Sequence, residues 1–307
     1  LVVQRTARLE KVFAGNREEF VWCSKKFKSF CGDLVKRMVP TINRLGWSSD
    51  KKFSEMPLLI QFGDAASSLG MGDIRVPHII KSRVVMPPHE GEYLTPTLCY
   101  DGPRPVRDQK QQATPILWKL NTVRHYSVIS DVPSADVPWS AKIDKAVFRG
   151  KPTGDQRSSI KDDKKRCLLN SRCHLVYTHE KSALVDAKLA WSWKKDREYG
   201  FPDVVDGVQV WAEPLVMHEQ LKYKAIIMLD GHDVATGLKW ALASNSVVMM
   251  TGPKFTSWTM EELLEPWVHY VPLIEDLTDV EEKMQWVIDN DADAHSIAIR
   301  GALWIKD

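Results

Sequence analysis

The chain has 307 residues and a formal net charge of +2, with 42 basic residues against 40 acidic ones. Hydrophobic residues make up 44% and charged residues 27%, a globular composition that excludes wholesale disorder. The near balance of charge argues against a dedicated nucleic-acid binder, and the sequence has no run of about eighteen apolar residues that would span a membrane.

The first third of the chain alternates between ordered and loop-like segments. Residues 1–47 carry apolar positions at helical spacing and are expected to be mainly helical. The run MPLLIQFGD, residues 56–64, is typical of a buried strand that opens into a loop. Residues 76–115 hold many prolines and glycines and are expected to be loop-rich, and order is expected to resume over residues 115–128.

A stretch rich in proline and serine, SDVPSADVPWSAK at 130–142, is expected to link two domains. The length of the chain suits two domains of ordinary size. We therefore expect an N-terminal, acceptor-side domain over residues 1–140, helical at its start and then Rossmann-like. A second Rossmann-like domain is expected over residues 141–307.

Strands and helices alternate through the second half of the chain. Such alternation indicates βαβ units and an α/β fold with a parallel, doubly wound sheet. Right-handed crossovers place the loops that follow the strands on one edge, where such sheets bind ligands. The expected strands are the apolar runs at 145–150, 223–231, 246–250 and 267–273.

The five cysteines lie at positions 23, 31, 99, 167 and 173 and form no CxxC pair, so the sequence indicates neither a zinc ribbon nor a thioredoxin-type motif. Cys23 and Cys31, like Cys167 and Cys173, are close enough in sequence to form disulfides in a secretory lumen, and free buried thiols remain the alternative. Twelve tryptophans are many for this length. Aromatic surfaces are one way to hold sugars, and packing in the core is the more common use of such residues.

The stretch FRGKPTGDQR, residues 148–157, brings two arginines and two glycines to one tight corner after an expected strand. Gly150 and Gly154 let the backbone approach a ligand closely, and a helix that begins just afterwards offers unpaired N–H groups to an anion. Arg149 and Arg157 add planar cationic forks that suit phosphate oxygens. The pattern predicts a diphosphate pocket; the alternative is a plain strand–turn–helix whose arginines pair with surface carboxylates.

The stretch from Tyr223 to Val248 repeats this logic at a second corner. An expected strand ends at Asp230 and Gly231, and Asp233 precedes an expected helix that contains Lys239. Asp230 is expected to accept a hydrogen bond from a sugar or ribose hydroxyl, and turn formation is its alternative role.

Three segments in this order make a known family recognisable. The segments FRGKPTG…R, LKYKAIIMLDG…LKWALASNSVV and EPWVHYVPLIEDLTDVEEKMQWV resemble the family-90 glycosyltransferases. That family includes Rumi-type protein O-glucosyltransferases, fungal capsule-associated xylosyltransferases and bacterial enzymes of lipopolysaccharide or capsule assembly. The form HDVATGLKWALASNSVV is most similar to the bacterial, viral and algal branch, and Gly237 stands where the Rumi-type branch carries an arginine. The resemblance runs from about Met56 to the end of the chain.

The resemblance implies a GT-B-like architecture, in which two Rossmann-type domains with parallel sheets face each other across a cleft. It implies an inverting glycosyltransferase that moves a sugar, glucose or xylose, from a UDP-sugar to a hydroxyl of a glycan or protein, without a cofactor or a metal ion. A non-catalytic nucleotide- or glycan-binding relative is the alternative, motivated by Gly237. The sequence has no GxGxxG after a strand, which argues against a dehydrogenase.

The resemblance also assigns residues to the donor. It places Arg149 and Arg157 on the diphosphate, while Gly150, Thr153 and Gly154 shape the pocket. The further donor contacts expected in the second domain are Tyr223, Lys224, Asp230, Gly231, Asp233, Lys239 and Ser246.

Asp64, at the end of LLIQFGD, is the candidate base that would deprotonate the acceptor hydroxyl, because it matches a strand-end aspartate of the family. Asp73 is the second choice, and capping of a loop is the alternative role of Asp64. The residues expected to line the cleft are Arg124, His125, Trp258 and Glu261. A structural role is the alternative for His125, and helix packing is the alternative for Trp258 and Glu261.

The chain starts at Leu1 rather than Met, so a signal peptide or membrane anchor is expected in a preceding segment. The family implies the Golgi or endoplasmic reticulum lumen for a eukaryotic protein and the cytoplasmic face of the membrane for a bacterial one. The expected partners are a UDP-sugar and a glycan or protein acceptor, with no nucleic acid and with membrane contact only through that anchor.

Overall fold

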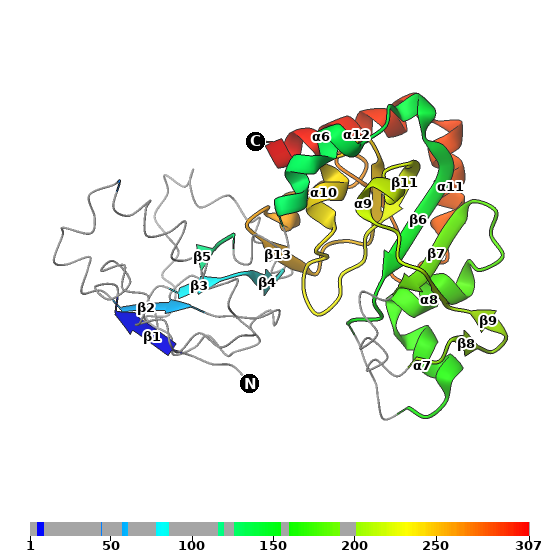
Figure 1. Ribbon diagram of the computed structural model, residues 1–307, viewed down its shortest axis with the longest axis horizontal. Helices are drawn as coiled ribbons and strands as arrows, with labels where there is room; N and C mark the ends of the chain where they lie inside the picture. Colours follow the sequence, from blue (N-terminus) through cyan, green and yellow to red (C-terminus); the bar gives the residue numbers. More distant parts are fainter. Residues whose placement is uncertain are drawn as a thin grey trace, which may run out of the picture. The chain divides into compact units, whose positions relative to one another are not determined.

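The computed structural model describes residues 5–8, 44, 57–60, 78–85, 116–119, 126–154, 160–190 and 201–306. The chain divides into two compact units (Figure 1). Unit 1 contains Leu1–Thr122 and Phe255–Trp258, and unit 2 contains Val123–Lys254 and Thr259–Asp307.

Unit 1 contains a small, mostly parallel sheet. Strand β1 (Arg5–Arg8) pairs antiparallel with β2 (Pro57–Ile60), and β2, β3 (His78–Ile80) and β5 (Ile116–Leu117) follow in parallel. A second, antiparallel pair joins β4 (Ser82–Val84) to β13 (Phe255–Ser257).

Strand β2 lies inside the apolar run expected to form a strand. Strand β1 departs from the helical expectation for residues 1–47, because pairing with β2 satisfies its backbone in an extended form.

Unit 2 is built on six strands that all run parallel. They are β6 (Ile143–Gly150), β7 (Val185–Ala190), β10 (Trp211–Ala212), β11 (Tyr223–Ile227), β12 (Val247–Met250) and β14 (Val271–Pro272). Their order in the sheet is β10-β7-β6-β11-β12-β14. Relabelled by chain position, this is the order 3-2-1-4-5-6 of doubly wound, Rossmann-type folds, with the switch point between β6 and β11. The expected α/β class with a parallel sheet is confirmed.

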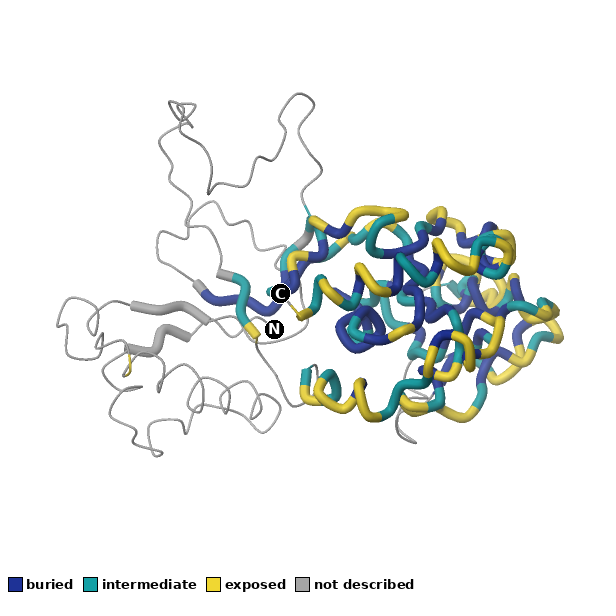
Figure 2. Tube along the Cα trace, turned by 90° about the horizontal axis from the view of Figure 1, so that it is seen from above, coloured by how far each residue is buried: buried dark blue, intermediate teal, exposed yellow. Residues whose placement is uncertain are grey.

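Helices cover both faces of this sheet, and the strands alternate their apolar side chains between them. Ala146 and Phe148 of β6 belong to one core cluster, while Val147 between them belongs to the other. The first core is closed by α7 (Asp163–Leu169), α8 (Ser171–Thr178), α11 (Val280–Asp289) and the start of α12 (Asp291–Lys306). The second is closed by α6 (Val132–Ala135), α9 (Met217–Gln220), α10 (Leu238–Leu242) and the end of α12. Figure 2 shows buried segments of the chain in dark blue and exposed segments in yellow.

The expectation of a linker at residues 130–142 is wrong. This stretch folds into the 3₁₀ helix η6 (Ser127–Asp131), then α6 and the 3₁₀ helix η7 (Trp139–Ala141). Val132 and Trp139 are buried against the sheet. Its prolines occupy the first turn or the cap of a helix, where a missing N–H costs little, so they do not keep the chain extended. The expected boundary at residue 140 therefore falls inside unit 2.

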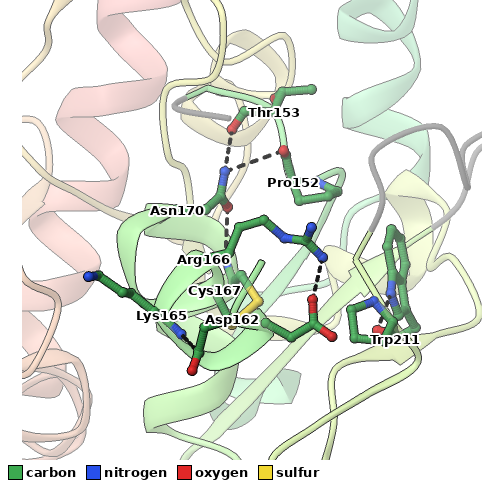
Figure 3. The surroundings of a disulfide bond; sticks show 11 residues. Pro152, Thr153, Asp162, Lys165, Arg166, Cys167, Asn170 and Trp211 are labelled. Atoms are coloured by element: carbon green, nitrogen blue, oxygen red, sulfur yellow. Dashed lines mark hydrogen bonds and ion pairs between the residues drawn. A yellow bond between two sulfur atoms is a disulfide. The ribbon is translucent and has the colours of Figure 1, made fainter. Parts of the chain in front are cut away.

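The open question about Cys167 and Cys173 is answered by a disulfide between them, in which both residues are fully buried (Figure 3). The bond joins α7 to α8 around Asn170, whose Oδ1 accepts from the backbone N–H of Cys173 at 3.0 Å. The Asn170 Nδ2 group donates to the carbonyls of Pro152 and Thr153, at 3.3 Å each. The disulfide thus holds a helix turn that supports the loop after β6.

None of the described helices is long and apolar enough to cross a bilayer.

Replacing both Cys167 and Cys173 by alanine is expected to lower the free energy of unfolding by about 2 kcal/mol, because the unfolded chain loses a short cross-link. Urea unfolding followed by circular dichroism measures the change. Refolding in reductant is the control, since it should destabilise the wild type and leave the double variant unaffected. Equal unfolding midpoints for the two proteins would contradict this account.

Candidate functional site

Two loops meet at the switch point of the unit 2 sheet, and together they form what we call the switch corner. One is Lys151–Gly154, directly after β6, and the other is Leu229–Asp233, after β11. Strands β6 and β11 are neighbours and parallel, so both loops leave the same carboxyl edge. Open α/β sheets bind their ligands at this place.

The glycines of the switch corner let the two loops touch. A Cβ atom on Gly231 would lie 2.4 Å from Thr153 Oγ1, so no other residue fits there without a shift. Gly154 has φ +105°, a conformation that side chains rarely adopt, and its Cβ position is 3.5 Å from the Gly231 carbonyl oxygen. These glycines are therefore required for packing one loop against the other.

Arg172, on α8, ties the two loops together. Its Nη1 donates to the Lys151 carbonyl at 2.9 Å and to Thr153 Oγ1 at 2.7 Å, and its Nη2 donates to the Leu229 carbonyl at 2.6 Å. Sequence reasoning missed this residue. It lies in a basic, helix-like run, KKRCLLNSR, in which nothing local distinguishes it from a solvated surface arginine.

Asp230 brings a carboxylate to the same corner. Its Oδ1 accepts from the backbone N–H of Ala235 at 3.3 Å, and its Oδ2 accepts from the N–H of Lys254 at 3.1 Å. Burial raises the pKa of Asp230 to about 6, although the two N–H groups and Arg172 favour its charged form. The group therefore changes charge close to neutral pH.

Arg149 lies at the end of β6, but its side chain pairs with a neighbouring strand and not with the loops of the switch corner. Its Nη2 forms an ion pair with Asp186 Oδ1 of β7 at 2.7 Å, and its Nη1 donates to the carbonyls of Phe148 and Asp186 at 2.9 Å each. The Tyr223 hydroxyl donates to the other Asp186 oxygen at 2.9 Å. The positive charge of Arg149 is thus already matched by a carboxylate within the sheet.

Three of the expected donor residues lie at the amino ends of their strands. Tyr223 and Lys224 begin β11, and Ser246 directly precedes β12. Lys224 Nζ contacts Asp144 at 2.7 Å and Asp291 at 2.6 Å, and Ser246 Oγ donates to the Tyr223 carbonyl at 2.8 Å. Because the sheet is parallel, these backbone positions are at the edge opposite the switch corner.

Lys239 and Glu261 form a buried ion pair with each other. The Nζ–Oε1 distance is 2.5 Å and both side chains are almost fully buried; Thr259 Oγ1 donates to the same Oε1 at 2.7 Å. At Gly237, which caps α10, a Cβ would lie 3.0 Å from Met228 Cε, so an arginine there would displace the methionine. Asp233 is buried, and its carbonyl accepts from the Gly231 N–H at 3.0 Å.

Of the remaining expected site residues, the structure describes Trp258. Trp258 belongs to unit 1, where Lys119 Nζ lies 3.6 Å from its ring centroid. Among the residues that the structure describes, no group of three or more His, Cys, Asp or Glu is arranged to hold a metal ion. Asp64, Asp73, Arg124, His125 and Arg157 lie outside the described residues.

Comparison with known proteins gives a consistent family. The model of glycosyl transferase family 90 matches residues 118–307, more than half of the chain. O-glucosyltransferase LpsA of Dichelobacter nodosus is 32% identical over 59% of this chain and 47% of its own length. Uncharacterized protein 179R of Invertebrate iridescent virus 6 is 30% identical, over 53% of this chain and 15% of its own. Protein O-glucosyltransferase 2 of Danio rerio is 31% identical, over 53% and 28%. The matched part covers less than half of each of these relatives.

The pKa of Asp230 predicts a pH-dependent stability. The pKa of Asp230 in the folded protein, about 6, lies above its pKa in the unfolded chain, so protonated Asp230 favours folding. This contribution to the free energy of unfolding is fully present below about pH 4 and is lost as the pH rises through about 6. Relative to the wild type, Asp230→Asn should gain stability over this interval, by up to roughly 3 kcal/mol.

Urea unfolding of both proteins between about pH 4 and 7 measures this difference. The altered hydrogen bonds of the variant add a pH-independent difference in the free energy of unfolding. Only the pH-dependent part of the difference reports on the carboxyl group. A difference between the two proteins that does not change with pH would refute the assignment.

Proposed function

Because this chain belongs to glycosyl transferase family 90, we propose that it is an inverting glycosyltransferase that uses a UDP-sugar. The sugar, glucose or xylose, would pass to a hydroxyl of a glycan or protein acceptor. The observation that carries the proposal is the switch corner, where Arg172 and two glycines hold a pair of loops at the ligand-binding edge of a Rossmann-type sheet.

In this proposal the switch corner binds the nucleoside diphosphate. Gly154 and Gly231 keep side chains away from the loop surfaces, so phosphate oxygens approach the backbone closely. The Arg172 guanidinium supplies fixed positive charge beside them, and Arg157, three residues after Gly154 in the sequence, is assigned as a second cation. Together they offset the negative charge that grows on the leaving diphosphate in the transition state. The proposal needs no metal ion for this charge.

Asp230 is proposed to accept a hydrogen bond from a hydroxyl of the ribose or the sugar. Its carboxylate is already oriented by two backbone N–H groups, so binding a hydroxyl requires little reorganisation. The base that deprotonates the acceptor is assigned to Asp64 of the N-terminal unit, with Asp73 as the second choice. Inversion follows if this base and the diphosphate lie on opposite faces of the sugar.

Arg149 and Lys239 have different proposed roles from those of the corner residues. Both cations form ion pairs with internal carboxylates, Asp186 and Glu261. Their proposed role is therefore to stabilise the structure around the donor site and not to bind the donor. Removing one partner of a buried pair such as Lys239–Glu261 leaves an uncompensated charge and costs about 3–5 kcal/mol.

The same pairing favours one alternative, a non-catalytic relative that binds a nucleotide or glycan. Two cations expected to face the donor are neutralised, and Gly237 offers no cation of its own. Release of UDP from a donor in the presence of mixed acceptors separates the two functions, because the alternative binds UDP without releasing it from a sugar.

The disulfide supports one of the two expected compartments. Bonds such as Cys167–Cys173 form and persist in oxidising surroundings. We therefore propose the endoplasmic reticulum or Golgi lumen over a cytoplasmic membrane face, with the acceptor a glycan or protein of that lumen.

UDP binding provides the first test. UDP at about 100 times its dissociation constant should stabilise the protein by roughly 2.7 kcal/mol, seen as a rise in Tm. Arg172→Gln should weaken UDP binding by about tenfold or more, because both loops lose a shared donor. Arg166→Gln on α7 removes the same charge outside the corner and should bind UDP normally. No stabilisation by millimolar UDP, or equal affinities for the two variants, would count against the assignment.

Asp64→Asn tests the base. Loss of general-base catalysis should reduce sugar transfer by about 10²–10⁴-fold while UDP still raises the Tm. Transfer is measured as UDP release with donor and acceptor present. Asp73→Asn is the matched control; normal transfer by Asp64→Asn together with loss in Asp73→Asn would move the role to Asp73.

A further inference from the structure

A pocket at the amino edge of the unit 2 sheet is not used by the proposed transfer. Its volume is about 380 Å³, within the range of roughly 300–1,000 Å³ typical of ligand pockets. It lies where α11 ends, α12 begins and the chain enters β14. Lys224, at the start of β11, pairs with Asp291 at the start of α12, which places this turn at the edge opposite the switch corner. The residues that line the pocket are Trp267, Trp286, Asp293, Ile297 and Arg300.

Two indole rings form the apolar walls of this pocket, which we call the tryptophan pocket. The ring centroids of Trp267 and Trp286 lie 4.7 Å apart at an interplanar angle of 68°. Trp267 is 41% exposed, unusually open for so large an apolar side chain. Ile297 is buried beneath them as part of the core. The two indole rings thus form an aromatic corner whose outer ring, Trp267, is partly exposed.

The backbone at Trp267 is held in an unfavourable conformation. Its φ is 63°, in the left-handed region where a bulky residue is an outlier. The conformation is secured by the Trp267 N–H, which donates to the Tyr270 carbonyl at 2.8 Å, and by Arg300 Nε, which donates to the Val268 carbonyl at 2.8 Å. Strain that the surroundings maintain in this way is concentrated at binding sites. Here the strained turn is the one that carries the exposed indole.

A hydrogen-bond acceptor and a hydrogen-bond donor, both charged, line the pocket together with the indoles. The Asp293 carboxylate is exposed on the first turn of α12 and makes no hydrogen bond or ion pair within the described part of the chain. Arg300, also exposed, lies two turns further along the same helix. A carboxylate that accepts, a guanidinium that donates and two apolar ring faces suit a ligand that is apolar on its faces and rich in hydroxyls at its edges.

We propose that the tryptophan pocket is a carbohydrate-binding site for a neutral oligosaccharide. The C–H faces of a pyranose pack on Trp267 and Trp286, and its hydroxyls donate to Asp293 and accept from Arg300. The opposite charges of these two groups balance, so a neutral chain is preferred to an acidic or basic one. The site holds a glycan at the amino edge of the sheet, separately from the switch corner, and binds it whether or not transfer takes place.

Three defined probes test the proposal on the full chain: maltohexaose, cellohexaose and xylohexaose. Two-dimensional ¹H–¹⁵N spectra report each tryptophan indole N–H, and Trp267→Phe and Trp286→Phe variants assign the two signals. At least one hexasaccharide at about 10 mM should shift both signals in a saturable way, corresponding to millimolar or tighter binding. The signals of Trp139 and Trp240 should stay in place.

Variants separate binding from folding. Trp267→Ala should weaken binding by about tenfold or more, since the main apolar wall is lost. If that variant does not fold, Asp293→Ala, at an exposed position on α12, should weaken binding instead. The proposal is overturned if none of the three probes shifts either signal, or if the folded variant binds as tightly as the wild type. UDP should leave the Trp267 signal unchanged, so failure here and failure of the donor site are independent results.

Discussion

The guanidinium of Arg172 is the interaction on which the candidate donor site depends. It donates to the loop after β6 and to the loop after β11 at once, and these are the two loops at the switch point of the sheet. Asn170, from the same helix turn, donates to the first loop again, and the Cys167–Cys173 disulfide holds that turn in place (Figure 3). Helix α8 therefore determines the shape of the corner, and Gly154 and Gly231 leave room for a ligand.

Internal pairing decides which charges remain for a ligand. A buried cation without a partner is costly, so Arg149 is matched by Asp186 and Lys239 by Glu261. These pairs stiffen the sheet and the α10 region while removing their charge from the donor site. Arg172, in contrast, donates to the carbonyls of Lys151 and Leu229 and to the Thr153 hydroxyl, so it connects the two loops of the corner.

The two edges of the parallel sheet serve different chemistry in the functions proposed here. Asp230, whose pKa is raised to about 6, and the cationic Arg172 lie at the carboxyl edge, and they suit a diphosphate and its sugar. The amino edge carries Trp267 and Trp286 with balanced polar groups, which suit a neutral glycan.

Local patterns in the sequence determined the α/β class, the strands at β6, β11 and β12, and the glycine-rich corner after β6, because periodicity and turn chemistry are written into neighbouring residues. Tertiary structure alone decided the rest. The proline-rich stretch at 130–142 is folded because Val132 and Trp139 bury against the sheet, and no local signal reports that burial. Arg172 reaches the corner through the α7–α8 turn, and Arg149 meets Asp186 through strand register. Such contacts join residues distant in sequence, so only the packed fold brings their charges together.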